Sequence, residues 1–320
     1  MKGKVIFEWL FWILLSVFLF GAGIDVAFLS PVVILFAPVP LMLLTCRLGP
    51  ARGAMGACFG ALLTYLLMGP VSAFMYSCEF GLLGFSFGCL FLKAKNGVEF
   101  IMAAILSSIS IKILLMLVFI KSIGFNPFVI TPETAQQLLS SVSGALSQGG
   151  LSVSQETLKA YAEAMVETVT IMMPSMLILF AALDSLVSFS AARAFLKKKG
   201  FEGHLLSLPP FGLWKFPKNI FWALLAALVL DMGAKAWPER ELFKMLSLNL
   251  MEVLRGVFLV QGLSLLWYFM SSRGLPKAVK VILTFFCALF APVSYVLSML
   301  GIFDIWYDLR KRIKLRRKNK

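Results

Sequence analysis

The sequence predicts an all-α membrane protein, a polytopic bundle of transmembrane helices. Of its 320 residues, 60% are hydrophobic and only 14% are charged, and the mean hydropathy is +0.89. Soluble domains are about 45–50% apolar and about 25% charged, so this composition excludes a water-soluble globular enzyme and a disordered chain. Apolar runs of the length that spans a bilayer, about 20 residues, recur along the whole chain.

Nine apolar segments are candidates for membrane helices. The first follows two lysines and predicts an uncleaved first helix. Only Asp25 separates it from the second, which predicts a tight hairpin, and Pro31, Pro38 and Pro40 make that second segment irregular because proline interrupts helical hydrogen bonding. The nine segments are 5–24, 26–45, 53–69, 72–92, 98–121, 167–192, 219–236, 246–270 and 279–303.

Lysine and arginine indicate the orientation of these segments. They precede the first segment and follow the second, fourth, sixth and eighth, and loops rich in them lie on the cytoplasmic side. The last eleven residues, 310–320, hold eight basic side chains, which predicts a cytoplasmic tail against anionic lipid headgroups and not a nucleic-acid site. We therefore expect eight crossings of the bacterial inner membrane, both termini inside, and a last segment broken or re-entrant at Pro292.

The segments divide the chain into four expected parts. Residues 1–200 form a six-helix membrane unit, in which the outer stretch 122–166 is either a helical lid or a poorly ordered spacer. Within that stretch, Ser154 caps a second helix that runs into segment 167–192. Residues 201–218 form a connector, 219–309 the C-terminal membrane helices and 310–320 the basic tail. Proline excludes a continuous helix in the connector, which is either a docking surface or a membrane-hugging link.

Charged side chains inside the apolar segments are the candidate functional residues. Inserting one such charge at the centre of a membrane helix costs about 2.5–3.5 kcal/mol of free energy on insertion scales. Glu79 and Lys112 lie at matched depths on consecutive helices, about 10–13 Å from the outer end at 1.5 Å per residue. They predict either the polar floor of an outward-facing ligand pocket or a structural ion pair. For Asp184, which lies nearer the cytoplasmic end, we expect a structural pair with Arg52 or Arg193.

Two further charged pairs follow helical spacing. Asp231 and Lys235 are four residues apart, and Glu252 and Arg255 are three apart, so each pair shares one helix face. Both pairs lie towards the outer ends of their segments. They form either one network of four side chains or two separate pairs.

Small residues recur at every fourth position in segments 53–69 and 72–92. Ala57 and Ala61 form one such stripe, and Gly84 and Gly88 another. This spacing lets helix backbones approach closely, so the stripes serve either internal packing or an interface with another membrane subunit. Trp214 in the connector is a further candidate interface residue.

The sequence contains no glycine-rich phosphate loop and no His-Glu-x-x-His, so we do not expect an enzyme. Five cysteines without a Cys-x-x-Cys pair and the lone His204 argue against a disulfide framework and a zinc site. No cofactor or metal is expected.

Two stretches resemble a known family. The connector sequence LPPFGLWKFP at 208–217 and the ending GIFDIWYDLRK at 301–311 are similar to motifs of the YybS-like family, bacterial predicted membrane proteins of unknown function. The resemblance covers nearly the whole chain.

Residues 1–200 more weakly resemble the S components of energy-coupling-factor vitamin transporters. The similarity lies in six helices, a proline-rich second segment, Arg47-Leu48-Gly49 and repeated Gly and Ala. It implies binding of a small solute from outside, and partners in a membrane coupling subunit and cytoplasmic ATPases, with Ala57 and Ala61 facing the coupling subunit. S components have six helices, whereas two or three more follow here. The competing hypothesis is a non-transporting scaffold that recruits partners through loop 193–218 and the basic tail.

Overall fold

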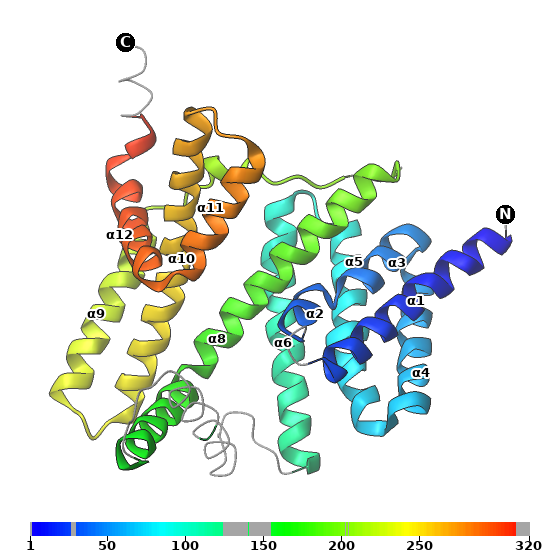
Figure 1. Ribbon diagram of the computed structural model, residues 1–320, viewed down its shortest axis with the longest axis horizontal. Coiled ribbons are helices and arrows are strands. Elements are labelled where there is room, and N and C mark those ends of the chain that lie inside the picture. Colours follow the sequence, from blue (N-terminus) through cyan, green and yellow to red (C-terminus); the bar gives the residue numbers. More distant parts are fainter. Residues whose placement is uncertain are drawn as a thin grey trace. The chain divides into compact units, whose positions relative to one another are not determined.

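The chain is helical throughout its described part and divides into two compact units. The computed structural model describes residues 2–26, 30–123, 140, 155–201, 203 and 205–311, and every regular element within them is a helix (Figure 1). This confirms the all-α fold. Unit 1 comprises Met1–Pro127 and Leu177–Leu208, and unit 2 comprises Phe128–Met176 and Pro209–Lys320. The long helix α8 (Gln155–Lys198) contributes to both units.

Several helices are long and apolar enough to cross a membrane, which confirms a polytopic membrane protein. The expected second segment is broken at Pro38 into α2 (Ser30–Phe36) and α3 (Val39–Leu48), and the seventh forms α9 (Ile220–Ala236). The count of eight crossings stays a prediction. Among the described residues there are five candidate spans, or six if one bent pair is a span: Gly3–Asp25, Pro50–Lys93, Gly97–Lys121, Val166–Lys198, Glu241–Ser272 and the pair Lys277–Leu289 with Ala291–Tyr307.

The longest of these stretches folds back on itself. It consists of α4 (Pro50–Tyr76), the π-helical η1 (Ser77–Leu82) and α5 (Leu83–Lys93). Gly69 has a φ of +86°, a conformation that favours glycine. A Cβ added at Gly60 would overlap the Tyr76 hydroxyl, although 16 residues of straight helix span about 24 Å. The chain therefore reverses at Gly69, and segments 53–69 and 72–92 are both present as antiparallel helices.

The small residues of α4 and α5 serve packing inside unit 1. A Cβ at Gly84 would lie 2.7 Å from the carbonyl oxygen that precedes α3, and one at Gly88 would overlap the Thr45 side chain of α3. The hypothesis that Gly84 and Gly88 face another subunit is therefore wrong, because α3 already fills the space that small residues leave. Ala57 and Ala61 are half-buried against the same core, and their role in an interface stays a prediction.

Aromatic packing in unit 1 fixes the position of α8. The rings of Phe91, Phe100 and Phe189 lie 5.5–6.1 Å apart and join α5, α6 (Gly97–Ile123) and α8. At the other side of α8, Phe195 packs edge-on against Trp12 of α1 (Lys2–Asp25) at 5.1 Å. These contacts hold the 177–198 part of α8 against helices that precede it by some 80 residues or more in sequence.

The helix expected to run into the sixth apolar segment is present, since α8 covers Gln155–Lys198. Ser154, its expected cap, lies outside the described residues. The rest of the predicted lid, between residues 124 and 154, lies outside the described residues apart from Ser140, as do His204 and the tail from residue 312.

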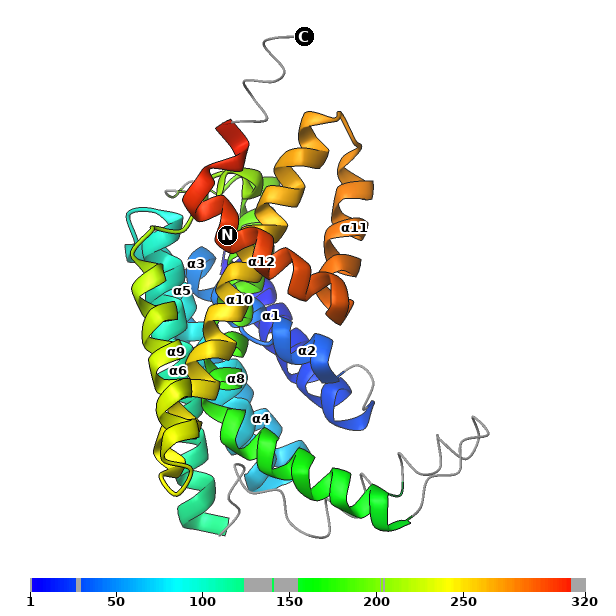
Figure 2. The same ribbon diagram turned by 90° about the vertical axis from the view of Figure 1, so that its left-hand side faces the viewer.

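Unit 2 is built around α10 (Glu241–Ser272), with α9 and α12 (Ala291–Tyr307) packed along it (Figures 1 and 2). α11 (Lys277–Leu289) and α12 meet at an angle of 100°. This confirms the expected break beside Pro292. α12 lies so close to α10 that a Cβ at Gly301 would overlap the Phe258 carbonyl oxygen, and one at Gly262 the Leu297 carbonyl oxygen.

Substitution of Gly301 tests this close packing. We expect Gly301→Ala to destabilise unit 2 by about 1–3 kcal/mol, the usual cost of overpacking, because the obstructing atom is backbone. Thermal unfolding of the purified protein in detergent, followed by circular dichroism, measures the effect. Gly21→Ala is the control, since its Cβ would meet only the Met68 side chain at 3.9 Å. Equal stability of the two variants would contradict the packing.

Candidate functional site

Three charged side chains from separate helical segments meet inside unit 1. Lys112 of α6 pairs with Asp184 of α8, donates to the Ser108 hydroxyl at 2.8 Å, and lies 3.9 Å from the nearer carboxylate oxygen of Glu79. The Asp184 side chain is 1% exposed, that of Lys112 15% and that of Glu79 21%. The structure thus confirms the predicted Glu79–Lys112 pair. We call these four residues the Lys112 cluster.

The expected partners of Asp184 were wrong. Arg52 and Arg193 instead donate to backbone carbonyl oxygens, those of Leu48 at 3.3 Å and Leu206 at 2.9 Å. Arg193 follows Asp184 by nine residues on the same helix, or about 13 Å of rise, which is too far for direct contact. The packing of α8 on α6 brings Asp184 to the level of the cluster lysine, and that packing could not be read from local spacing.

Glu79 lies in the π-helical segment Ser77–Leu82. Single π-helical turns within α-helices are rare and occur frequently at functional sites. The apolar periodicity of segment 72–92 predicted a regular helix, so no sequence signal indicated this turn.

The cluster carries more acceptors than donors. It contains two carboxylates and one ammonium group, and one oxygen of Asp184, Oδ1, is buried without a hydrogen-bond partner among the described residues. The hydroxyl of Ser188, one turn further along α8, is also buried without one. Buried polar atoms are nearly always paired, so these oxygens suit a small polar or cationic ligand. Among the described residues, no three His, Cys, Asp or Glu side chains gather in a metal-binding group.

A pocket of about 300 Å³ opens elsewhere in unit 1. Arg47 at its wall is paired with Glu8 at 2.5 Å. None of the pocket residues belongs to the Lys112 cluster, and the expected pocket above Glu79 and Lys112 stays a prediction. The pocket is lined by Arg47, Leu196, Lys199, Gly200, Phe201 and Gly203.

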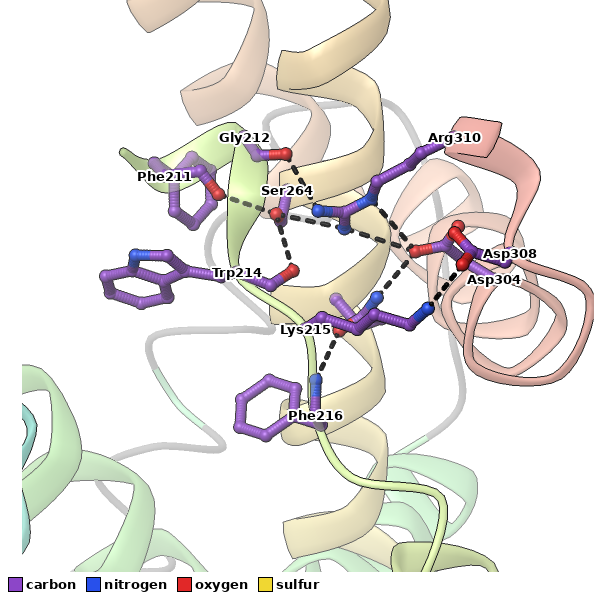
Figure 3. A network of polar contacts seen from close by, with 10 residues as sticks. Phe211, Gly212, Trp214, Lys215, Phe216, Ser264, Asp304, Asp308 and Arg310 are labelled. Atoms are coloured by element: carbon purple, nitrogen blue, oxygen red, sulfur yellow. Dashed lines mark hydrogen bonds and ion pairs between the residues drawn. The ribbon is translucent and has the colours of Figure 1, made fainter. Parts of the chain in front are cut away.

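A second polar cluster in unit 2 joins the connector to the end of α12 (Figure 3). The Arg310 guanidinium donates to Asp304 Oδ2 at 3.1 Å, to the Gly212 carbonyl oxygen at 2.7 Å and to the Ser264 hydroxyl at 3.2 Å. Gln261 donates to the same Asp304 oxygen at 2.6 Å. Arg310 is 8% exposed and the other three side chains are fully buried. We call Gln261, Ser264, Asp304 and Arg310 the Arg310 clamp.

The clamp also fixes the backbone of the connector. The one hydroxyl hydrogen of Ser264 is shared between the carbonyl oxygens of Phe211 and Trp214, at 2.6 and 3.1 Å, and the Phe216 N–H donates to Gln261 at 3.0 Å (Figure 3). These bonds satisfy backbone groups that the prolines of the connector keep out of a helix. The two family-like stretches, 208–217 and 301–311, therefore meet in one structure.

A partly exposed ion pair lies beside the clamp. Lys215 of the connector binds Asp308 at 3.0 Å (Figure 3). The hydrogen bond from Lys215, helped by the charge of nearby Lys311, lowers the pKa of the Asp308 carboxyl below its usual value. The pair therefore forms fully above the usual pKa of aspartate and weakens as the pH falls through the lowered value.

One sequence interpretation of this region changes, and another stays open to test. Arg310 was assigned to a headgroup-facing tail, but it is buried in the clamp because Asp304 offers it a buried carboxylate. Trp214 is half-buried, donates from its indole N–H to the Pro209 carbonyl oxygen at 2.8 Å and packs on Phe211. Its role at an interface stays a prediction.

The remaining charged pairs are confirmed. Lys235 binds Asp231 at 2.7 Å, and Arg255 Nε binds Glu252 at 2.9 Å. Arg255 also lies over the Tyr295 ring, 4.8 Å from its centroid. In the part of the chain that the structure describes, no ion pair links the Asp231–Lys235 pair to the Glu252–Arg255 pair. Each pair therefore forms within a single helix.

Sequence reasoning missed most of the clamp. Asp304 stands in an apolar run, and Gln261 and Ser264 lie three residues apart in the apolar helix α10. These polar residues within apolar stretches could have indicated the clamp, because a buried polar group needs a hydrogen-bond partner.

A pair of aspartate variants tests the clamp. We expect Asp304→Asn to destabilise the protein by about 3–5 kcal/mol, because it leaves the buried Arg310 without its counter-charge. Asp308→Asn removes a partly exposed ion pair and should cost at most about 1 kcal/mol. Thermal unfolding in detergent compares them. If both variants melt together, the buried pair has no special role.

Comparison with known proteins identifies the family. Residues 14–305 match the family described as "Predicted membrane protein (DUF2232)". A curated relative is "Uncharacterized protein YybS" of Bacillus subtilis (strain 168), 22% identical over 286 residues that cover 88% of this chain and 90% of the relative. No solved structure matches the chain, and these comparisons lend no support to the S-component resemblance. The chain belongs to the DUF2232 family of predicted membrane proteins, as the YybS-like motifs indicated.

Proposed function

We propose that this chain is an integral membrane protein that binds a small polar solute at the Lys112 cluster. The observation that carries the proposal is the meeting of Glu79, Lys112 and Asp184 on three apolar helices. Ionisable side chains within membrane helices are costly and generally mark substrate or ion pathways. A purely structural role would be served by one lysine and one acid, whereas this site holds two acids.

The geometry of the cluster suits a ligand with both a donor and an acceptor. Asp184 and Ser108 use two of the three N–H donors of Lys112. Glu79 lies 3.9 Å from the amine, beyond hydrogen-bond distance, and keeps a partly exposed carboxylate. A solute that accepts a hydrogen bond from the third N–H of Lys112 and donates one to the Glu79 carboxylate would satisfy both groups.

An S-component-like arrangement gives this site a direction of access. Under the inferred orientation, both termini are cytoplasmic in a bacterial inner membrane, and the cluster lies about 10–13 Å below the outer end of its helices. The solute would enter from outside, and a membrane coupling subunit with cytoplasmic ATPases would drive transport. The weak resemblance of residues 1–200 to S components and the depth of Glu79 and Lys112 support this version.

A scaffold is the second candidate, and the Arg310 clamp is the observation that favours it. The clamp orders an irregular connector, leaving Leu213 57% exposed beside the half-buried Trp214. The basic residues 312–320 follow directly. The ordered connector, together with this basic stretch of sequence, would recruit a partner without any transported solute.

Native mass spectrometry of the protein in mild detergent tests solute binding. We expect a small molecule bound to the wild type and to the control Asp231→Asn, whose ion pair is exposed. Glu79→Gln should lose it, since a lost hydrogen bond to a charged group costs about 1–3 kcal/mol, or roughly five- to a hundredfold in affinity. Unchanged unfolding of Glu79→Gln would show that the fold is intact.

Two outcomes of this experiment would argue against solute binding. Apo protein in all three samples would contradict solute binding. A co-purifying protein that is lost on deletion of residues 312–320 would favour the scaffold. That deletion keeps Arg310, so the clamp stays intact.

A further inference from the structure

We propose that the Lys112 cluster binds one exchangeable monovalent cation, either a proton or a sodium ion. The cation balances the second carboxylate of the cluster. This inference deepens the proposed function and rests on it, because it concerns the same site. Its test needs no solute, so the two can fail separately.

The first step is the charge count. Glu79 and Asp184 bring two negative charges, and Lys112 brings one positive charge. Leaving a charge unbalanced in a low-dielectric interior is costly. Lys112 is already shared between the two carboxylates, and it binds Asp184 more closely than Glu79.

Among the described residues, no lysine or arginine other than Lys112 pairs with Glu79 or Asp184. On the helices that carry these charges, the nearest other charges lie nine or more residues away, or at least about 13 Å along the helix. The neighbouring titratable side chains are neutral donors: the Tyr76 hydroxyl is bonded to Ser16 at 2.6 Å, and the Cys78 thiol is buried. The nearest charges before and after the cluster on these helices are Arg52, Lys93, Glu99, Lys121, Glu167 and Arg193, and the neighbouring α1 carries Glu8 and Asp25.

The second step is the pair of unpartnered oxygens on α8. Asp184 Oδ1 and the Ser188 hydroxyl oxygen are both fully buried and lack a hydrogen-bond partner among the described residues. The two residues are four apart, so they share one face of the helix. Hard cations take oxygen ligands, and a carboxylate beside a hydroxyl supplies two. The two carboxylates and Lys112 leave one net negative charge, which a monovalent cation balances.

The third step concerns exchange. Asp184 is fixed by Lys112 and fully buried, whereas the Glu79 side chain is 21% exposed and stands on a π-helical turn. Glu79 is therefore the group through which the cation enters and leaves. In the proton version, the Glu79 carboxylate gains H⁺ and becomes a neutral acid. In the sodium version, Na⁺ binds at the oxygens of Asp184 and Ser188 and both carboxylates stay ionised.

Two measurements on the full-length protein in detergent distinguish the versions. Infrared difference spectroscopy across a pH titration detects the C=O stretch of a protonated carboxylic acid. Thermal unfolding in sodium chloride, compared with choline chloride at equal ionic strength, detects sodium binding. The variants are Glu79→Gln, Asp184→Asn and Ser188→Ala, and Asp231→Asn is the matched control. Ser188→Ala keeps the inference testable if Asp184→Asn does not fold.

Either of two results supports the inference. A carboxylic acid band at neutral pH that is lost in Glu79→Gln and kept in Asp231→Asn assigns a proton. A sodium-dependent rise in the unfolding midpoint that is lost in Ser188→Ala and kept in Asp231→Asn assigns sodium. The inference is overturned if the wild type shows neither signal, or if both signals survive in the cluster variants. A positive result with no bound solute by mass spectrometry would overturn the solute proposal alone.

Discussion

The ion pair between Lys112 and Asp184 is the interaction on which unit 1 depends. Each side chain is costly in an apolar helix and becomes tolerable only beside the other. They stand 72 residues apart in sequence, so their pairing obliges the second half of α8 to pack beside α6. The aromatic contacts of α8 with α1, α5 and α6 then follow from the same placement. The chain reverses direction at Gly69, and this reversal places Glu79 beside Lys112 as the third charge of the cluster.

Unit 2 meets the same requirement with a different charge count. In the Arg310 clamp, one arginine faces one aspartate, and at its edge Lys215 faces Asp308. One oxygen of the buried Asp304 is unpartnered, as is one of Asp184, so the orphan oxygens alone do not separate the two sites. The two sites differ in their charge balance. In the clamp one arginine balances one aspartate, whereas the Lys112 cluster holds two carboxylates and one lysine. That difference is why ligand binding is assigned to unit 1.

The parts of the fold that were predictable depend on neighbours in sequence. Composition and run length predicted an all-α membrane protein, helical spacing predicted the Asp231–Lys235 and Glu252–Arg255 pairs, and Pro292 predicted the break between α11 and α12. The depth argument for Glu79 and Lys112 also held, because consecutive helices of a bundle tend to lie side by side.

The parts that were missed depend on tertiary contacts. The partner of Asp184 was sought among arginines that have backbone partners of their own, since nothing local shows which helix α8 packs against. The π-helical turn at Glu79 leaves the apolar pattern of its segment unchanged. Arg310 was hidden in a run of basic residues, and only the folding of the connector onto α10 shows that it differs from its neighbours.

A double-mutant cycle on Lys112 and Asp184 tests the central claim most directly. The unfolding free energies of Lys112→Met, Asp184→Leu and the double variant would be measured in the same detergent. If Lys112 and Asp184 stabilise each other by direct contact, each single variant removes the same ion pair, and the double variant is less destabilised than the sum of the two by about 0.5–3 kcal/mol. Additive effects would contradict the account, because they would mean that neither charge depends on the other.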